Sequence, residues 1–368
     1  MNNKTEKVYQ HFVPKFYLRL FSTNRNSVGA YIFNDDRYVK NASLDSIGGV
    51  DFLYGEDGQI EDWFSEFEGL WNNTIKRIIQ TNSLEIDKED YSSLLFFIFL
   101  SDARSKTTAD INNKFINELA ILTNNVDPKN SKIKYSKKIV EYEVPNYYPI
   151  TSAESVIPIM LDLKLVLLIN NTSSEFITSD CFVCKYNQFL LDKKHIFGYG
   201  YGTIGFQCFI PISPNHCLLL YDPSIYELKT VNDTFTINDN KEIYKLNKLF
   251  YYNSDKYLFF NNEYDKNRLD VLLKNNDRLI IDDNTILKSD DNQYMLRLPN
   301  RCIKKNFNIS FTKTKKQANK IKIETHQSAP IRLIAKKLDD GEFETPEKVL
   351  KQIEGKKFFV QKKEQWKK

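Results

Sequence analysis

The stretch YQHFVPKFYLRLF, close to the start of the chain, sets a histidine, a lysine and an arginine among aromatic residues. His11 could act near neutral pH as a general base, a metal ligand or a hydrogen-bond donor to phosphate. Pro14 restricts the backbone beside it. Lys15 and Arg19 stand four residues apart, so a short helix would present both cations on one face. The alternative is a half-buried histidine that bonds a carbonyl group.

Two carboxylates follow on a predicted helix. Apolar residues recur at threes and fours from Gln59 to Gln80, which predicts an amphipathic helix. Glu61 and Glu68 would lie within about 20° of each other at the border of its apolar face. Carboxylates at such a border need a cation, a metal ion or hydrogen-bond donors to stay charged, unless they are simply solvated. Arg104, one turn after the apolar run LLFFIFL, could meet them in a structural ion pair or in a phosphate site.

Two segments near predicted strands add further candidates. FITSD is an apolar strand that ends in Thr178, Ser179 and Asp180, and sites are often built at strand ends. A turn that caps itself with hydroxyl and carboxylate groups would have the same sequence. PISPNHC predicts a defined turn around Asn215, with a binding loop as the second interpretation.

The cysteines give little support for a metal site. Cys181 and Cys184 form a CxxC, which would need Cys208, Cys217 and His216 to complete a zinc site. Structural zinc sites normally show two close ligand pairs, so zinc is not expected and buried free thiols are the better interpretation. The odd number of five cysteines also favours a reducing compartment over a disulfide framework.

The pattern of the whole chain predicts an α+β fold. A small N-terminal β element, a hairpin turning at residues 34–36, and long helices would pack with a central antiparallel β-rich region and further helices. Helical spacing is expected over 87–122, 153–163 and 240–273. Helices would occupy about residues 59–165, and short strands about residues 164–235.

Charge divides the chain into a globular domain, residues 1–300, and a basic C-terminal segment, residues 301–368. The segment holds 19 Lys and Arg against 8 Asp and Glu, whereas the rest holds 33 against 40. Such a segment is a candidate arm for nucleic acid or a solvated tail. The longest apolar run, Leu94 to Leu100, is too short for a membrane span, and the polar start does not resemble a signal peptide. We therefore expect a cytoplasmic protein without a membrane partner.

The opening stretch, with FITSD and PISPNHCLLLYD, resembles the uncharacterised DUF4238 family, whose members begin with a QHxVPxFYLRxF-type motif. The resemblance covers about residues 9–225 and names no established chemistry. It departs at Cys181 and Phe182, where the family continues with Asn-Pro. The matching residues are His11, Pro14, Tyr17, Leu18, Arg19 and Phe21 in the opening, Glu61 and Glu68 in an acidic helix, Arg104, and Thr178 to Asp180.

If these residues converge, they suit metal-dependent hydrolysis of phosphodiester bonds by a nuclease. Glu68 and Asp180 would hold Mg²⁺ or Mn²⁺, and His11 would activate or position water. Arg104 or Arg19 would steady the phosphate. A role as a toxin or in defence against phage rests on the general bacterial setting of the family. The catalytic candidates are His11, Glu61, Glu68, Arg104 and Asp180, and the substrate-binding candidates are Gln10, Lys15, Arg19, Thr178, Ser179 and Asn215.

Two alternatives stay open. One is a non-catalytic module that binds nucleic acid or a partner protein and whose polar cluster is structural. The other is hydrolysis of a small nucleotide. A homo-oligomer is compatible with all of these hypotheses.

Overall fold

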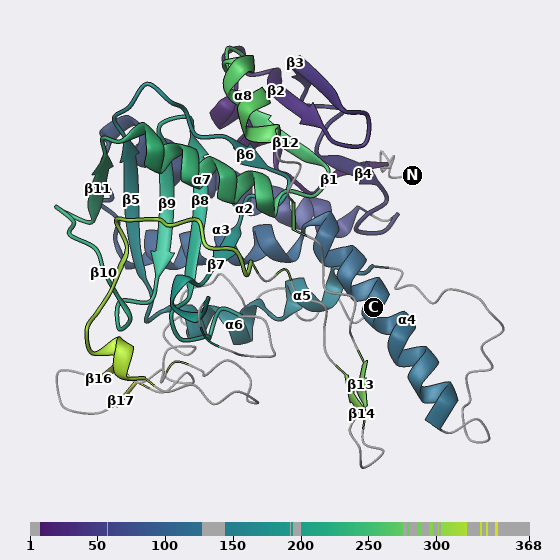
Figure 1. Ribbon diagram of the computed structural model, residues 1–368. Coiled ribbons are helices and arrows are strands. Elements are labelled where there is room, and N and C mark those ends of the chain that lie inside the picture. Colours follow the sequence, from purple (N-terminus) through teal and green to yellow (C-terminus); the bar gives the residue numbers. More distant parts are fainter. Residues whose placement is uncertain are drawn as a thin grey trace.

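Figure 1 shows the computed structural model of the chain. It describes residues 8–56, 58–126, 144–191, 193, 200–274, 278–279, 286–288, 294–296, 301, 303–321, 332, 336–337 and 343–344. Helices pack on antiparallel and mixed sheets, which confirms the predicted α+β class. Within the described residues, no helix combines the length and apolar character that crossing a membrane requires.

A five-stranded sheet forms the middle layer of the protein. Its order is β11-β5-β9-β8-β7, and all neighbours are antiparallel except β11, which is parallel to β5 and departs from the expected antiparallel pattern. The strands are β5 (Lys164–Asn170), β7 (Cys184–Tyr186), β8 (Gln207–Ser213), β9 (His216–Tyr221) and β11 (Thr234–Ile237). Both faces are buried, which explains the nearly continuous apolar sequences of β5 and β9.

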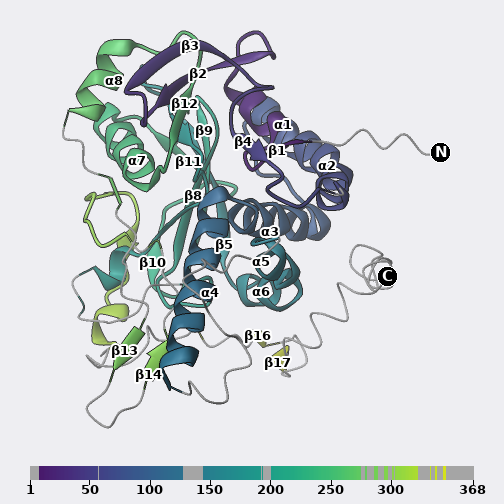
Figure 2. The same cartoon turned by 90° about the vertical axis from the view of Figure 1, so that its right-hand side faces the viewer.

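Helices cover the two faces of this sheet separately (Figure 2). Leu165 and Leu167 of β5 belong to the core shared with α2, α3 and α6, whereas Val166 and Leu168 belong to the core shared with α7. Successive side chains of β5 point to opposite faces of the sheet and therefore pack into two different cores. The helices are α2 (Gln59–Thr81), α3 (Lys88–Ala103), α4 (Lys106–Val126), α5 (Tyr147–Thr151), α6 (Ala153–Met160), α7 (Asn240–Asn253) and α8 (Lys266–Leu273).

The helix expected over 87–122 is wrong as a single element, because it divides into α3 and α4. The break lies at Arg104 and Ser105, where the Ser105 hydroxyl accepts a hydrogen bond from the backbone N–H of Thr108 at 3.2 Å. Such a bond satisfies a donor at the start of a new helix. The break lets the Arg104 side chain enter the core.

The predicted hairpin is β2 (Ser27–Ile32) with β3 (Arg37–Ser43), and it belongs to a larger sheet of order β3-β2-β12-β6. β12 (Tyr257–Phe260) corrects the expectation of helix through 240–273. Its residues Leu258 to Phe260 are buried between β2 and β6 (Thr178–Ser179), and aromatic residues suit such a strand. Gly29 of β2 permits the close approach of Phe260 in β12, since a Cβ atom at residue 29 would lie 2.5 Å from the Phe260 ring.

Several short elements lie outside these sheets and long helices. The opening motif forms β1 (Tyr9–His11), α1 (Lys15–Leu18) and η1 (Arg19–Phe21), and β1 pairs with β4 (Gly49–Asp51). The remaining elements are η2 (Gln188–Leu190), β10 (Tyr226–Glu227), β13 (Ile286–Lys288), β14 (Tyr294–Leu296), β15 (Lys313–Thr314), η3 (Ala318–Lys320), β16 (Lys336–Lys337) and β17 (Phe343–Glu344).

The packed body continues past the expected boundary at residue 300. Ile303, Phe307 and Ile309 are buried in the core beneath α7, and β15 pairs with β10. The basic segment therefore starts as part of the globular body. Most of its length after residue 321 lies outside the described residues.

Candidate functional site

The buried Arg104 side chain gathers three of the other catalytic candidates. Its Nη1 atom donates to Glu68 Oε1 at 2.8 Å, and its Nη2 atom lies 3.8 Å from Glu61 Oε2. Nη2 also donates to the main-chain carbonyl of His11 at 2.6 Å. The guanidinium lies over the Phe64 ring, 3.9 Å from its centroid. The predicted meeting of α2 and the end of α3 therefore occurs around Arg104, whose Nη1 and Nη2 atoms both have partners.

Tyr54, which no sequence motif indicated, completes this network. Its hydroxyl donates to the Arg104 carbonyl at 2.7 Å and accepts from Arg104 Nε at 3.4 Å. Gln10 fixes Tyr54 by accepting from its backbone N–H and by donating to the Gly55 carbonyl. Burial alone would lower the pKa of Arg104, but Tyr54 and the two glutamates outweigh it and raise that pKa. The guanidinium therefore stays charged.

His11 joins the network through its backbone, and its imidazole serves another contact. Nε2 lies 3.0 Å from the Leu44 carbonyl, which can only accept, so Nε2 carries the hydrogen. Burial lowers the pKa of His11 to about 4, so the ring is neutral at pH 7. This contact matches the simpler interpretation of the lone histidine, a half-buried ring that bonds a carbonyl.

Asp180 has different partners from the arginine network. Its two carboxylate oxygens accept from the backbone N–H groups of Asp255 and Lys256 at 3.0 and 2.7 Å, which braces the turn between α7 and β12. Burial raises the pKa of Asp180 to about 6, and Asp255 adds to the shift. The two predicted metal ligands, Glu68 and Asp180, are thus engaged by separate groups. Among the described residues, no cluster of three His, Cys, Asp or Glu is arranged to hold a metal ion.

Tyr17 connects the opening motif to the FITSD strand. Its hydroxyl donates to the Pro211 carbonyl at 2.5 Å and lies 2.6 Å from Thr178 Oγ1, which must donate to it. The Tyr17 ring stacks on Phe182, with centroids 3.9 Å apart. Two segments of the family motif therefore meet in a buried junction between α1, β6 and β8.

Removal of the Tyr17 hydroxyl tests this junction. We expect Tyr17→Phe to lower the free energy of unfolding by about 1–2 kcal/mol, because the Pro211 carbonyl and the Thr178 hydroxyl lose a buried partner. Urea denaturation measures the change, with Tyr148→Phe as the control because Tyr148 is 66% exposed. Equal effects of the two variants would contradict a structural role for the Tyr17 hydroxyl.

The other substrate-binding candidates do not form one site. Lys15 pairs with Asp45 at 2.5 Å near the surface, and Arg19 is exposed. Ser179 Oγ accepts from the backbone N–H of Cys181 at 3.2 Å. Asn215 is exposed in the turn between β8 and β9. The structure does not bring these four residues together.

The cysteines of the central sheet are buried thiols. Cys184, Cys208 and Cys217 lie on β7, β8 and β9, and burial raises the pKa of each thiol. His216 instead contacts Ser213 Oγ at 2.8 Å and Asn82 Oδ1 at 2.7 Å. Protein groups therefore occupy both of its ring nitrogens.

A basic surface with aromatic residues runs along α7, and sequence reasoning missed most of it. We define the α7 face as Lys241, Tyr244, Lys245, Lys248 and Tyr252 of α7 with Lys304 and Lys305. The α7 residues of this face recur every three or four positions, and this spacing is the sequence signal that could have identified the face.

Residues 303–311 lie antiparallel beside α7 and add their lysines to this face. Lys305 Nζ lies 5.6 Å from the Tyr252 ring centroid, near the end of α7. Near the start of the helix, Lys245 Nζ donates to the Asn308 carbonyl at 2.7 Å. Residues 301–321 contain seven Lys or Arg and no Asp or Glu. The charge segregation seen in the sequence is therefore partly built into the folded surface.

The fold and the network define an α+β protein whose N-terminal sheet and helices are joined through a buried arginine. The model of the family described as "Protein of unknown function (DUF4238)" matches residues 9–264, and the chain belongs to this family. The match confirms the resemblance and extends beyond residue 225, through β12. No curated protein and no solved structure matches the chain.

Proposed function

We propose that the protein is a nucleic-acid-binding module that uses the α7 face, and that the network around Arg104 is structural. The observation that carries the proposal is the gathering of lysines and tyrosines on one surface, where Lys241 and Lys304 are exposed and Lys245 pairs with Glu242 at 2.5 Å. Lysines supply the phosphate contacts that dominate non-specific affinity for nucleic acid. Tyrosine rings stack on unpaired bases, which favours a single-stranded ligand.

The partners of the catalytic candidates support a structural role for the network. Arg104 donates to Glu68 and to the His11 carbonyl, and Asp180 accepts two backbone N–H groups. A guanidinium or carboxylate that serves the fold in this way has less capacity for a phosphate or a metal ion.

A metal-dependent nuclease is the second candidate function. The observation that favours it is the partial exposure of two neighbouring carboxylates, since the side chains of Glu61 and Glu68 are 16% and 24% exposed. Mg²⁺ or Mn²⁺ would have to compete with Arg104 for these oxygens. A role as a toxin or in defence against phage is part of this second candidate and rests on the general bacterial setting of the family, not on any residue.

Charge reversal at the two ends of the α7 face tests the first candidate. We expect K241E/K304E to weaken binding to single-stranded DNA or RNA and to reduce the salt slope of log K by roughly 1 per lysine, because phosphate contacts are lost. Both lysines are exposed. The matched control is K76E/K88E, which makes the same charge change at exposed lysines of α2 and α3, on the other side of the sheet. Equal weakening by the two variants would exclude the α7 face as the binding surface.

The same nucleic acids, incubated with Mg²⁺ or Mn²⁺ and with EDTA, test the second candidate. Metal-dependent cleavage that is lost in a folded Glu68→Gln variant and kept in K76E/K88E would favour the nuclease. If intact nucleic acid is recovered under all conditions while binding persists, the binding module is the better description.

A further inference from the structure

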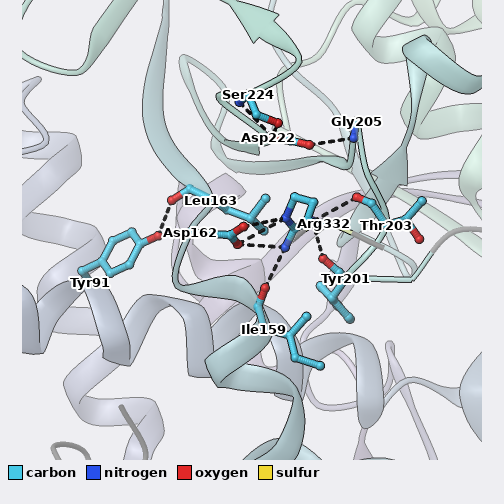
Figure 3. Close-up of polar contacts among 10 residues, drawn as sticks. All are labelled: Tyr91, Ile159, Asp162, Leu163, Tyr201, Thr203, Gly205, Asp222, Ser224 and Arg332. Carbon is cyan, nitrogen blue, oxygen red and sulfur yellow. Dashed lines mark hydrogen bonds and ion pairs between the residues drawn. The ribbon is translucent and has the colours of Figure 1, made fainter. Parts of the chain in front are cut away.

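One arginine of the basic C-terminal segment is buried in the body of the protein (Figure 3). The side chain of Arg332 is 3% exposed. Its Nε atom donates to the Asp162 carboxylate, 3.0 Å from Oδ2. Its Nη2 atom donates to Asp162 Oδ1 at 3.0 Å and to the Ile159 carbonyl at 2.6 Å. The carboxylate therefore binds one edge of the guanidinium in a bidentate manner.

Three successive carbonyl groups bind the other side of Arg332. Its Nη1 atom donates to the carbonyls of Tyr201 and Thr203 at 2.7 and 3.0 Å. Its backbone N–H donates to the Gly202 carbonyl at 2.8 Å. The two bonds from Nη1, together with the contacts of Nε and Nη2 to Asp162 and Ile159, satisfy all five N–H donors of the guanidinium. We call the residues Ile159, Asp162 and Tyr201 to Thr203 the arginine socket.

One wall of the socket is the end of α6. Ile159 lies in the last turn of this helix, where carbonyl groups lack helical partners and the helix dipole favours a cation. The chain after α6 is fixed by the Tyr91 hydroxyl, which donates to the Leu163 carbonyl at 2.6 Å beside Asp162 (Figure 3). Neither of these features depends on Arg332.

The other wall, residues 200–205, is also braced from within the body. The Thr203 hydroxyl accepts from the Gly200 N–H at 3.0 Å, and Gly205 donates its N–H to Asp222 Oδ2 at 2.8 Å. Gly205 has a φ of +73°, which suits glycine. Asp222 is held in turn by the backbone N–H of Ser224 at 2.9 Å. The acceptors that face Arg332 are therefore positioned by contacts of their own.

We propose that the arginine socket is a guanidinium-binding site that holds the C-terminal segment against the body. The socket lies within the part of the chain that the family model matches, whereas Arg332 lies beyond it. Its acceptors suit a planar group with five donors. A lysine ammonium has three donors and a compact charge, and it cannot reach both walls in the same way. The site therefore selects guanidinium over ammonium.

Chemical rescue tests this proposal. Arg332→Ala removes the atoms that ethylguanidinium would replace. We expect the variant to melt at least about 5 °C below the unmodified protein, because the Asp162 carboxylate and the carbonyls lose their partner. We also expect trypsin to cut its C-terminal segment faster. Millimolar ethylguanidinium should restore much of the melting temperature of this variant and leave that of the unmodified protein unchanged, because its socket is occupied.

Ethylammonium and the double variant D162N/R332A are the controls. Ethylammonium should not rescue Arg332→Ala, and ethylguanidinium should rescue the double variant far less. If Arg332→Ala does not fold alone, recovery on refolding with ethylguanidinium supports the proposal, and failure to recover overturns it. Equal rescue by the two cations, or an unchanged melting temperature and trypsin pattern in Arg332→Ala, also overturns it.

Discussion

Replacing Arg104 with methionine should lower the free energy of unfolding by about 3–5 kcal/mol, the typical cost of removing one partner from a buried ion pair. Glu68 would lose its 2.8 Å ion pair, and the His11 carbonyl would lose a 2.6 Å hydrogen bond. Methionine restores much of the volume against Phe64, so the loss reports missing donors more than a cavity. Urea denaturation followed by circular dichroism measures the change.

Two further variants show whether the loss comes from the network. Arg77→Met removes an ion pair with Asp90 in which the arginine is 52% exposed, so it should cost at most about 1 kcal/mol. Adding Glu68→Gln to Arg104→Met should recover part of the stability, because it removes a carboxylate that has lost its partner. If Arg104→Met costs no more than Arg77→Met, the structural interpretation of the network is wrong.

Asp180 and His11 should give the protein opposite responses to acid. The folded-state pKa of Asp180 is raised to about 6 from 3.8. The protonated Asp180 carboxyl therefore stabilises the folded state, and this contribution is fully present below the unfolded pKa. It is lost as pH rises through about 6, by up to about 3 kcal/mol. The folded-state pKa of His11 is lowered to about 4 from 6.5. The neutral His11 ring therefore stabilises the folded state above pH 6.5, and this contribution is lost as pH falls toward 4.

Single substitutions separate the two responses. On acidification from pH 6.5 to 4, Asp180→Asn should lose more stability than the unmodified protein, because the gain from protonating Asp180 is absent. Over the same pH change, His11→Gln should instead lose less stability than the unmodified protein, because glutamine does not take up a proton. Glutamine also keeps a donor for the Leu44 carbonyl. Urea denaturation across this pH range measures both slopes. Two variants with the slope of the unmodified protein would contradict the assignment.

The sequence predicts elements well where one pattern dominates. α2 and the β2–β3 hairpin follow from their periodicities and turn residues. β12 was missed because its aromatic run continues the spacing of α7, and only its pairing with the distant β2 makes it a strand. The division at Arg104 likewise depends on a buried contact that periodicity does not report.

The sequence predicted one contact among the candidate residues, but not the partners of the others. Arg104 does meet Glu61 and Glu68, as their helix positions suggested. His11, however, contributes a backbone carbonyl to Arg104, and any residue could supply that group. Asp180 bonds backbone N–H groups that lie 75 and 76 residues further along the chain. Residue type indicates side-chain chemistry, but it does not indicate which remote backbone group uses it.

The sheet of order β3-β2-β12-β6 has a consequence for synthesis on the ribosome. Its hairpin ends at residue 43, but β12, which pairs with the inner edge of β2, begins at residue 257. At typical rates of translation, that edge stays unpaired for on the order of 10–40 s. An open edge can pair with other nascent chains, so this edge of β2 is open to association between chains until β12 has been translated.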